Sequence, residues 1–194
     1  MPGKKASARS KRSTRTAART ARWSGLPKAK IMAIYNEHVR RFRTKTAKSV
    51  FISQNEFELG TNDEWSNATE IDRNPAWVDL DNANYVWSSR EPNSEHAVIS
   101  ERFNLPTNRS IRRGRLRLAV DNYAIVLING RIVTYDAPQA DEDFFNPGRT
   151  FNVRSVLRRG RNDIVIIAFN FDGPRSSSNP AGVAARLNVR LSGS

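Results

Sequence analysis

The chain has 194 residues, a formal net charge of +13 and no cysteine. The lack of cysteine excludes disulfides and thiolate metal sites, and two histidines, His38 and His96, are too few and too far apart for a histidine metal cluster. No run approaches the roughly 18 apolar residues of a membrane span, and the first residues lack the apolar core of a secretory signal.

The surplus of positive over negative charge lies entirely in the first fifty residues. They hold every lysine, fifteen of the 32 Lys and Arg residues, and a single acid, Glu37. The rest of the chain is close to neutral, with arginine as its strong base. This division indicates a polycationic arm that seeks a polyanion and a body that acts through its shape.

Residues 1–22 form the predicted arm. They are small, hydroxyl-bearing or basic, with no large apolar side chain beyond Met1, so we expect them to be disordered until bound. Contact with nucleic acid or another polyanion is predicted for Lys4, Lys5, Arg9, Lys11, Arg12, Arg15, Arg19 and Arg22, with Arg40, Arg41 and Arg43 of the following segment. The alternatives are a solubilising tail, a nuclear-targeting tail or an organelle transit peptide.

Residues 23–49 are predicted to be a linker and one basic amphipathic helix. Apolar residues from Ile31 to Phe42 recur at helical spacing within the expected helix, Ala29–Lys48, and basic residues crowd its second half. We expect the apolar stripe to dock on the body or on a partner.

From residue 50 the hydrophobic period becomes two, which predicts a single β domain over 50–194. The expected strands are Val50–Leu59, Ala97–Leu105, Arg115–Asp121, Tyr123–Ile128, Arg131–Tyr135, Thr150–Val156, Asp163–Phe171 and Val183–Leu191. The strongest local signal is Asn129-Gly130, because both residues accept the positive φ of a two-residue hairpin. Many short strands and little helix predict an all-β fold, a jelly-roll β-sandwich preceded by the arm and helix.

The order of motifs over residues 75–191 resembles the galactose-binding-like jelly roll, an accessory or sugar-binding domain of many glycoside hydrolases. The motifs are ANYVW at 83–87, RFNLP at 102–106, RLRLAVDNYAIVLINGRIV at 115–133, SVLRRGRNDIVIIAFN at 155–170 and PAGVAARLNV at 180–189. Turn and strand requirements explain each motif by itself, so the resemblance implies the architecture more strongly than it implies sugar binding.

Four aromatic residues set among amides and carboxylates are the candidate ligand platform, namely Trp65, Trp77, Tyr85 and Trp87. The same residues could instead close the core, as the family pattern suggests for its opening segment.

The sequence contains no convincing catalytic set. Glu95 with Glu101, or Asp141, Glu142 and Asp143, could be nominated as glycosidase carboxylates, but the triplet has the composition of a solvated loop. A Ser–His–acid triad would have only His96 to recruit in the body. We therefore expect a protein that is not an enzyme.

No cofactor is expected, although the family resemblance makes a structural calcium ion an open alternative. Asp121, Asn170 and Asp172 lie near predicted strand ends, but nothing in the sequence fixes their mutual geometry, so no metal ligand is assigned.

The layout favours a virion protein, a minor capsid or cement component whose arm contacts the genome or neighbouring subunits while its jelly roll makes protein contacts. The alternatives are a carbohydrate-binding module that recognises glycans and a cellular nucleic-acid-binding protein. The expected location is the virion, with the nucleus or cytoplasm as the alternatives.

Overall fold

The computed structural model describes residues 26–42, 51–136, 148–171 and 173–193. The predicted arm, with Arg43 and most of the linker, lies outside these residues. The described elements are α2 (Lys28–Arg41), β1 (Phe51–Ser53), β2 (Glu56–Gly60), β3 (Ala68–Glu70), β4 (Val86–Ser88), β5 (His96–Leu105), β6 (Ile111–Asp121), β7 (Tyr123–Ile128), β8 (Arg131–Asp136), β9 (Arg149–Asn152), β10 (Gly160–Phe169) and β11 (Gly182–Leu191).

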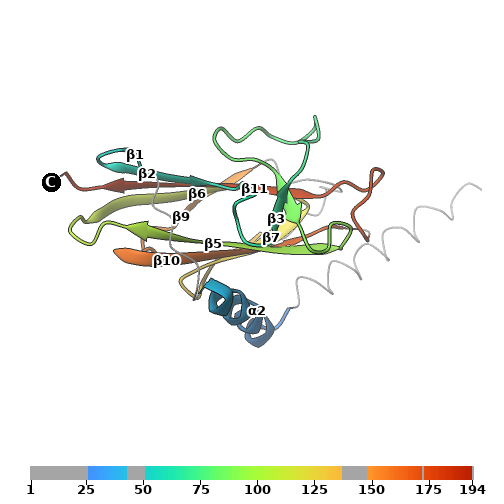
Figure 1. Cartoon of the computed structure of the whole chain (residues 1–194), viewed down its shortest axis with the longest axis horizontal. Helices are drawn as coiled ribbons and strands as arrows, with labels where there is room; N and C mark the ends of the chain where they lie inside the picture. Colours follow the sequence, from blue (N-terminus) through green and yellow to red (C-terminus); the bar gives the residue numbers. More distant parts are fainter. Residues whose placement is uncertain (1–25, 43–50, 137–147, 172, 194) are drawn as a thin grey trace, which may run out of the picture.

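The strands form two antiparallel sheets that face each other, as the all-β prediction expected (Figure 1). Sheet A has the order β5-β10-β7-β8. In sheet B, β11 lies centrally: β6 and then β9 lie on one side of it, and β2 with β1 and β4 with β3 lie on the other. Alternate residues of both sheets point inward and form the main core, as in a β-sandwich.

The hairpin between β7 and β8 confirms the prediction from Asn129-Gly130. Asn129 has φ 51° and Gly130 has φ 75°, so both residues adopt the left-handed conformation that a tight hairpin requires. Asn129 also donates from Nδ2 to the carbonyl of Val156 at 2.9 Å, which fixes the hairpin against the turn before β10.

Several strand boundaries differ from the sequence prediction. The expected single strand Val50–Leu59 is a hairpin, because the chain turns at residues 54–55 and β1 pairs back on β2. β9 ends at Asn152, where the Val153 carbonyl instead accepts bonds from the amides of Val156 and Leu157. The short strands β3 and β4 were not predicted, since three residues carry too little alternation.

Helix α2 forms a third layer on the outer face of sheet A (Figure 1). Ile31 and Tyr35 are buried there against Ile125, Leu127 and other apolar residues of β7 and β10. The helix therefore covers an outward-facing apolar surface, as its amphipathic pattern predicted. The division of the chain into an arm, a helical linker and a β domain over 50–194 stays a prediction.

A buried ion pair fastens the end of α2 to the sheet. Arg102 on β5 donates from Nε to Asp163 Oδ1 on β10 at 2.7 Å, and both side chains are 6% exposed. The two terminal nitrogens of Arg102 donate to the carbonyls of Phe42 and Val39, and its guanidinium lies 4.9 Å from the centre of the Phe42 ring. One side chain thus satisfies helix-end carbonyls and neutralises a buried carboxylate.

Substitution of Arg102 should strongly destabilise the protein. Arg102→Met leaves Asp163 buried without its cation, so we expect a loss of about 3–5 kcal/mol in the free energy of unfolding, measured by urea denaturation. The exposed Arg90 provides the control, and Arg90→Met should change stability by less than about 0.5 kcal/mol. The double variant Arg102→Met/Asp163→Leu should recover part of the loss; equal losses in single and double variants would contradict this role.

Candidate anion-binding site

The outer face of sheet B carries rows of arginine side chains. Leu116 and Leu118 of β6 point into the core, so by strand alternation the neighbouring Arg113, Arg115 and Arg117 point outward. On β11 the same alternation turns Arg186, Asn188 and Arg190 outward. We call these six residues with Glu56 and Thr150 the arginine face.

The register of β6 and β11 places like charges directly opposite each other. Arg117 faces Arg186, and Arg113 faces Arg190, with Arg115 and Asn188 between the two pairs. Opposed like charges on neighbouring strands destabilise a sheet. The register of β2 places Glu56 opposite Arg190, which offsets part of this repulsion. The remaining electrostatic cost in the free protein is one that an anionic ligand would relieve.

Most of these arginines have no acidic partner in the described part of the chain. Arg186 is the exception: Nη1 donates to the Asp81 carbonyl at 2.9 Å, and Nε lies 3.9 Å from Glu58 Oε2. Arg113, Arg115, Arg117 and Arg190 form no ion pair with a described carboxylate and reach solvent. Their guanidinium groups therefore remain available to an anion.

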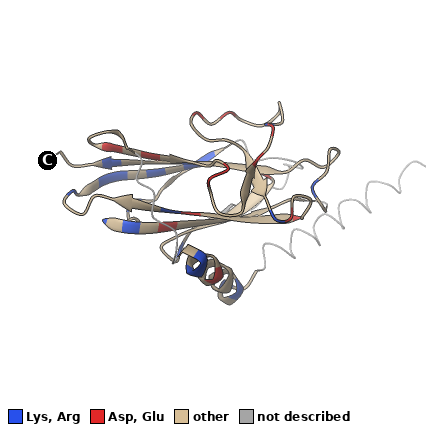
Figure 2. Cartoon of the chain, viewed as in Figure 1, with Lys and Arg blue, Asp and Glu red and all other residues tan. Residues whose placement is uncertain are grey.

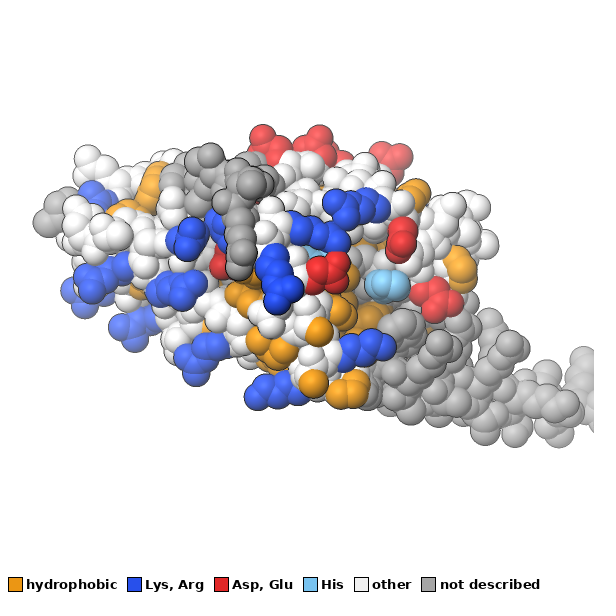
Figure 3. Space-filling view, turned by 60° about the horizontal axis from the view of Figure 1, so that its bottom comes forward, with side chains coloured by type: hydrophobic (Ala, Val, Ile, Leu, Met, Phe, Trp, Pro, Cys, Tyr) orange, Lys and Arg blue, Asp and Glu red, His pale blue; other side chains and the backbone are white. Residues whose placement is uncertain are grey.

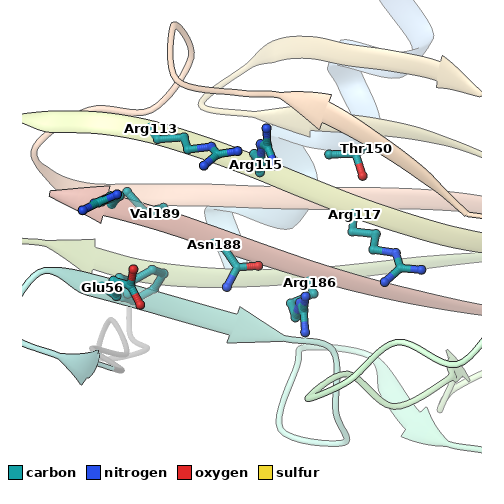
Figure 4. A pocket seen from close by; sticks show the side chains of 10 residues that line it. Glu56, Arg113, Arg115, Arg117, Thr150, Arg186, Asn188 and Val189 are labelled. Atoms are coloured by element: carbon teal, nitrogen blue, oxygen red, sulfur yellow. The ribbon is translucent and has the colours of Figure 1, made fainter.

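The arginine face lines an open groove of about 310 Å³ (Figure 4). Figure 4 shows its labelled side chains spread over β2, β6 and β11 and the neighbouring edge of the sheet. Guanidinium groups bind carboxylate, sulfate or phosphate through paired hydrogen bonds. The groove can therefore hold an extended anionic ligand across its rows.

A second groove of about 300 Å³ adjoins the first on the β2 side. Its polar side chains are acceptors and amides, namely Glu58, Asn62, Glu64, Asn82 and Asn84. Glu58 lies between the two grooves: its Oε1 accepts a bond of 2.8 Å from Asn82 Nδ2, and its Oε2 accepts one from Asn188 Nδ2. Cationic donors and carboxylate acceptors therefore lie side by side on this face of the sheet.

The body is divided into an acidic and a basic part. Residues 51–101 contain eleven acids and two arginines, whereas residues 102–194 contain fifteen arginines and seven acids. Figure 2 shows the basic residues along β6 and β11 and at the start of β10, and acidic residues on the loops above sheet B. A near-neutral net charge thus conceals a local positive field.

The loop of residues 71–85 borders the arginine face and is anchored by a buried carboxylate. Trp77 Nε1 donates to Asp121 Oδ2 at 2.9 Å, and Trp77 packs on Tyr85 with ring centres 4.8 Å apart. Burial raises the pKa of Asp121 to about 7, although the bond from Trp77 opposes this shift. The anchored loop supplies the Asp81 carbonyl that holds Arg186.

The four aromatic candidates from the sequence lie in the interior. Trp65, Trp77, Tyr85 and Trp87 are each no more than 5% exposed. Their polar atoms donate to protein acceptors: Trp65 to the Gly60 carbonyl at 2.8 Å and Tyr85 to the Val78 carbonyl at 2.8 Å. Of the two roles left open, the structure favours core packing over stacking on a sugar.

Two of the basic candidates, Arg40 and Arg41, are described, and both are exposed on α2. Arg41 forms an ion pair of 2.6 Å with Glu37. The other basic candidates lie outside the described residues, so contact of the arm with a polyanion stays a prediction.

Of the candidate catalytic carboxylates, the structure describes Glu95, which is half-buried, and Glu101. Glu101 is fully buried, and the Asp141–Asp143 triplet lies outside the described residues. His96 is half-buried, with Nδ1 at 3.3 Å from Ser94 Oγ.

The calcium candidates do not form a ligand set in the described chain. Asn170 donates from Nδ2 to the Gly173 carbonyl at 3.0 Å, Asp121 is held by Trp77, and Asp172 is not described. Among the described residues there is no group of three or more His, Asp or Glu side chains that could hold a metal ion. No helix in this part of the chain is long and apolar enough to cross a membrane.

The arginine face was missed in the sequence analysis, although a signal was present. Arg113, Arg115 and Arg117 alternate along β6, and Arg186 and Arg190 occupy the matching parity of β11. Alternation alone identifies which residues share a face of one strand. It does not show that the two strands are neighbours, which is what opposes their charges.

Comparisons with known proteins give similarity to solved structures only; no family model and no curated protein matches the chain. A family 35 carbohydrate-binding module from Clostridium thermocellum has a TM-score of 0.38 and 19% identity, over 67% of this chain and 96% of that one. A family 35 module from an environmental isolate has a TM-score of 0.40 and 16% identity, over 70% and 93%. A β-glucuronidase from an uncultured Clostridium species has a TM-score of 0.41 and 12% identity, over 74% of this chain and 30% of that one.

These neighbours are two carbohydrate-binding modules and a β-glucuronidase. The β-sandwich architecture of this chain is shown by the strand pairings of its two sheets.

Asp121→Asn should make the stability of the protein less dependent on pH. The raised pKa means that the folded chain binds a proton which the unfolded chain releases between about pH 4 and 7, so stability falls as pH rises through this window. The fall is at most about 4 kcal/mol. An asparagine keeps a hydrogen-bond acceptor for Trp77 and carries no charge. Thermal unfolding should therefore show that the variant becomes more stable relative to the wild type as the pH rises. The exposed Asp79→Asn is the control, and parallel pH profiles for Asp121→Asn and the wild type would contradict the prediction.

Removal of one opposed arginine should stabilise the free protein. Arg113→Thr relieves the repulsion with Arg190 and keeps a residue suited to a strand, so we expect a gain of about 0.5 kcal/mol at low salt. The gain should shrink in about 1 M salt, where exposed charges are screened. Arg90→Thr, at an exposed position outside the strands, serves as the control. A loss of stability at low salt would show that the arginine pairs are not repulsive.

Proposed function

We propose that the protein is a non-catalytic binding module that holds an acidic polysaccharide on the outer face of sheet B. The observation that carries this proposal is the set of five outward arginines on β6 and β11, four of which pair with no described carboxylate. Their repulsion makes the face a preformed site for a ligand with several negative groups.

The neighbouring acceptors favour a ligand that also carries hydroxyl groups. Glu56 lines the groove of the arginine face, and Glu58 and Glu64 line the second groove that adjoins it on the β2 side. These carboxylates would repel an anion that lay against them, but they accept hydrogen bonds from sugar hydroxyls. A polysaccharide that alternates acidic and hydroxyl groups matches both halves of the face, whereas a phosphodiester chain matches only the arginines.

The shape of the site is consistent with binding along a polymer. The arginines occupy three successive rows of β6 and β11 and line one open groove, so a chain can lie across them without a terminal residue entering a pocket. The exposed aromatic side chain of the described part, Phe51, does not line this groove, and Phe57 beneath it is buried, so the groove offers polar groups and no exposed ring.

This proposal concerns the sheet B face. The roles of the arm in a virion or in contact with nucleic acid, and the corresponding locations, stay predictions from the sequence.

The proposal predicts that Arg115→Gln/Arg117→Gln binds polygalacturonate at least tenfold more weakly than the wild type. Each charged hydrogen bond that is lost costs about 1.5–3 kcal/mol, and every 1.4 kcal/mol is a factor of ten. Calorimetry or affinity electrophoresis of the full chain measures this effect, with uncharged galactan as the neutral polymer.

The matched control is Arg73→Gln/Arg90→Gln, which removes the same charge outside the arginine face. Equal binding of the two double variants, or equal binding of galactan and polygalacturonate, would overturn the proposal. Tighter binding of duplex nucleic acid at the same arginines would replace the polysaccharide with a different ligand.

A further inference from the structure

A second cluster of arginines lies on the turn between β9 and β10. Arg154, Arg158, Arg159 and Arg161 fall within eight residues, and Arg131 follows the hairpin that is bonded to this turn. All five are exposed. We call these five residues the arginine turn. Figure 3 shows basic side chains gathered on the left part of the molecule, toward the end at which β10 begins in Figure 1.

Buried amides hold the arginine turn rigid. Asn162 is fully buried; it accepts from the Arg158 amide at 3.0 Å and donates to the carbonyls of Arg158 and Gly160 at 2.7 and 2.9 Å. Asn129 donates to Asn162 Oδ1 at 2.8 Å, which links the turn to the β7–β8 hairpin. The backbone that presents the arginines is therefore fixed before any ligand arrives.

Three guanidinium groups are also held in place. Arg158 Nε donates to the Arg161 carbonyl at 2.9 Å, Arg154 Nε to the Ile111 carbonyl at 3.0 Å, and Arg131 Nη1 to the Ser155 carbonyl at 3.3 Å. Each of these hydrogen bonds uses one N–H donor of the guanidinium group and leaves its other N–H groups available to another acceptor.

No described carboxylate pairs with the five arginines. The acid nearest in sequence, Asp163, is buried and bonded to Arg102. The turn is consequently a local concentration of positive charge on a rigid support.

We propose that the arginine turn is a docking surface for the phosphate backbone of a nucleic-acid duplex. The turn differs from the arginine face because no described carboxylate lies among its exposed guanidinium groups, and its buried amides are engaged with the protein. It therefore matches closely spaced phosphates and offers little to sugar hydroxyls.

Other polyanions fit the arginine turn less well. Proteins bind single-stranded nucleic acid through aromatic side chains on which the bases stack, and they bind an anionic bilayer by inserting apolar side chains into it. The exposed large apolar residues of the described chain, Phe51 and Ile52, lie on β1 and not on the turn. A duplex held by phosphate contacts needs neither feature, and such contacts carry no sequence preference.

The test measures binding of the full chain to a mixed-sequence DNA duplex at salt concentrations from about 50 to about 200 mM, a range over which binding through phosphate contacts weakens strongly. In Arg158→Ala/Arg159→Ala/Arg161→Ala, the slope of log affinity against log salt should flatten by up to about 2.7, at roughly 0.9 for each lost contact. The matched control, Arg73→Ala/Arg90→Ala/Arg175→Ala, removes the same charge elsewhere in the body and should keep most of the wild-type slope.

The lysine variant Arg158→Lys/Arg159→Lys/Arg161→Lys keeps the charge and should keep the slope, even where the alanine variant is destabilised. Equal slopes in the two alanine triples would overturn the proposal, as would binding to phosphatidylserine vesicles without binding to the duplex. This inference does not depend on the polysaccharide proposal: the alanine triple in the turn should still bind polygalacturonate, and Arg115→Gln/Arg117→Gln should keep the salt slope for DNA.

Discussion

The pairing of β6 with β11 is the constraint on which the core and the arginine face both depend. Ten antiparallel partners join the strands, with Leu116 opposite Leu187 inside and Arg117 opposite Arg186 outside. A slip of one residue would turn the leucines to solvent and the arginines into the core. Burial of the apolar set therefore forces the arginines into opposition, and the core supplies the free energy that keeps like charges together.

The arginines of this protein fall into different physical classes, and their contacts separate them. Arg102 is buried, bonded to Asp163 and to helix carbonyls, and Arg186 is held by the Asp81 carbonyl beside Glu58. Such side chains stabilise the fold. Arg113, Arg115 and Arg190 lack these partners among the described residues, so their charge is available to a ligand. Composition alone, which counts all arginines equally, cannot make this distinction.

The candidate sites bind through charged groups because the described tryptophans are packed in the core. Trp77 and Tyr85 pack together under the loop of residues 71–85, and Trp65 and Trp87 belong to the main core. The tryptophans that the structure describes are therefore unavailable for stacking on sugar rings or bases. Recognition then depends on the spacing of guanidinium groups and on the acceptors beside them. The arginine face has carboxylates next to its cations, whereas the arginine turn has none among the described residues.

The sequence by itself determined the class of the fold, the Asn129-Gly130 hairpin and the docking stripe of α2. Each of these follows from local periodicity or from the backbone freedom of a few adjacent residues. The short strands β3 and β4 escaped prediction because three residues show too little alternation. Trp65 and Trp87 could not be assigned from composition, since the same residues suit a core or a platform.

Only the tertiary structure decided the sites. The partnership of β6 with β11, about seventy residues apart in the chain, opposes the arginines; the pairing of β5 with β10 joins Arg102 to Asp163 and fastens the end of α2. These relations are long-range, and strand pairing depends on how whole sheets bury their apolar faces together. Local patterns specify which way a side chain points, whereas the packed fold specifies which charges it meets.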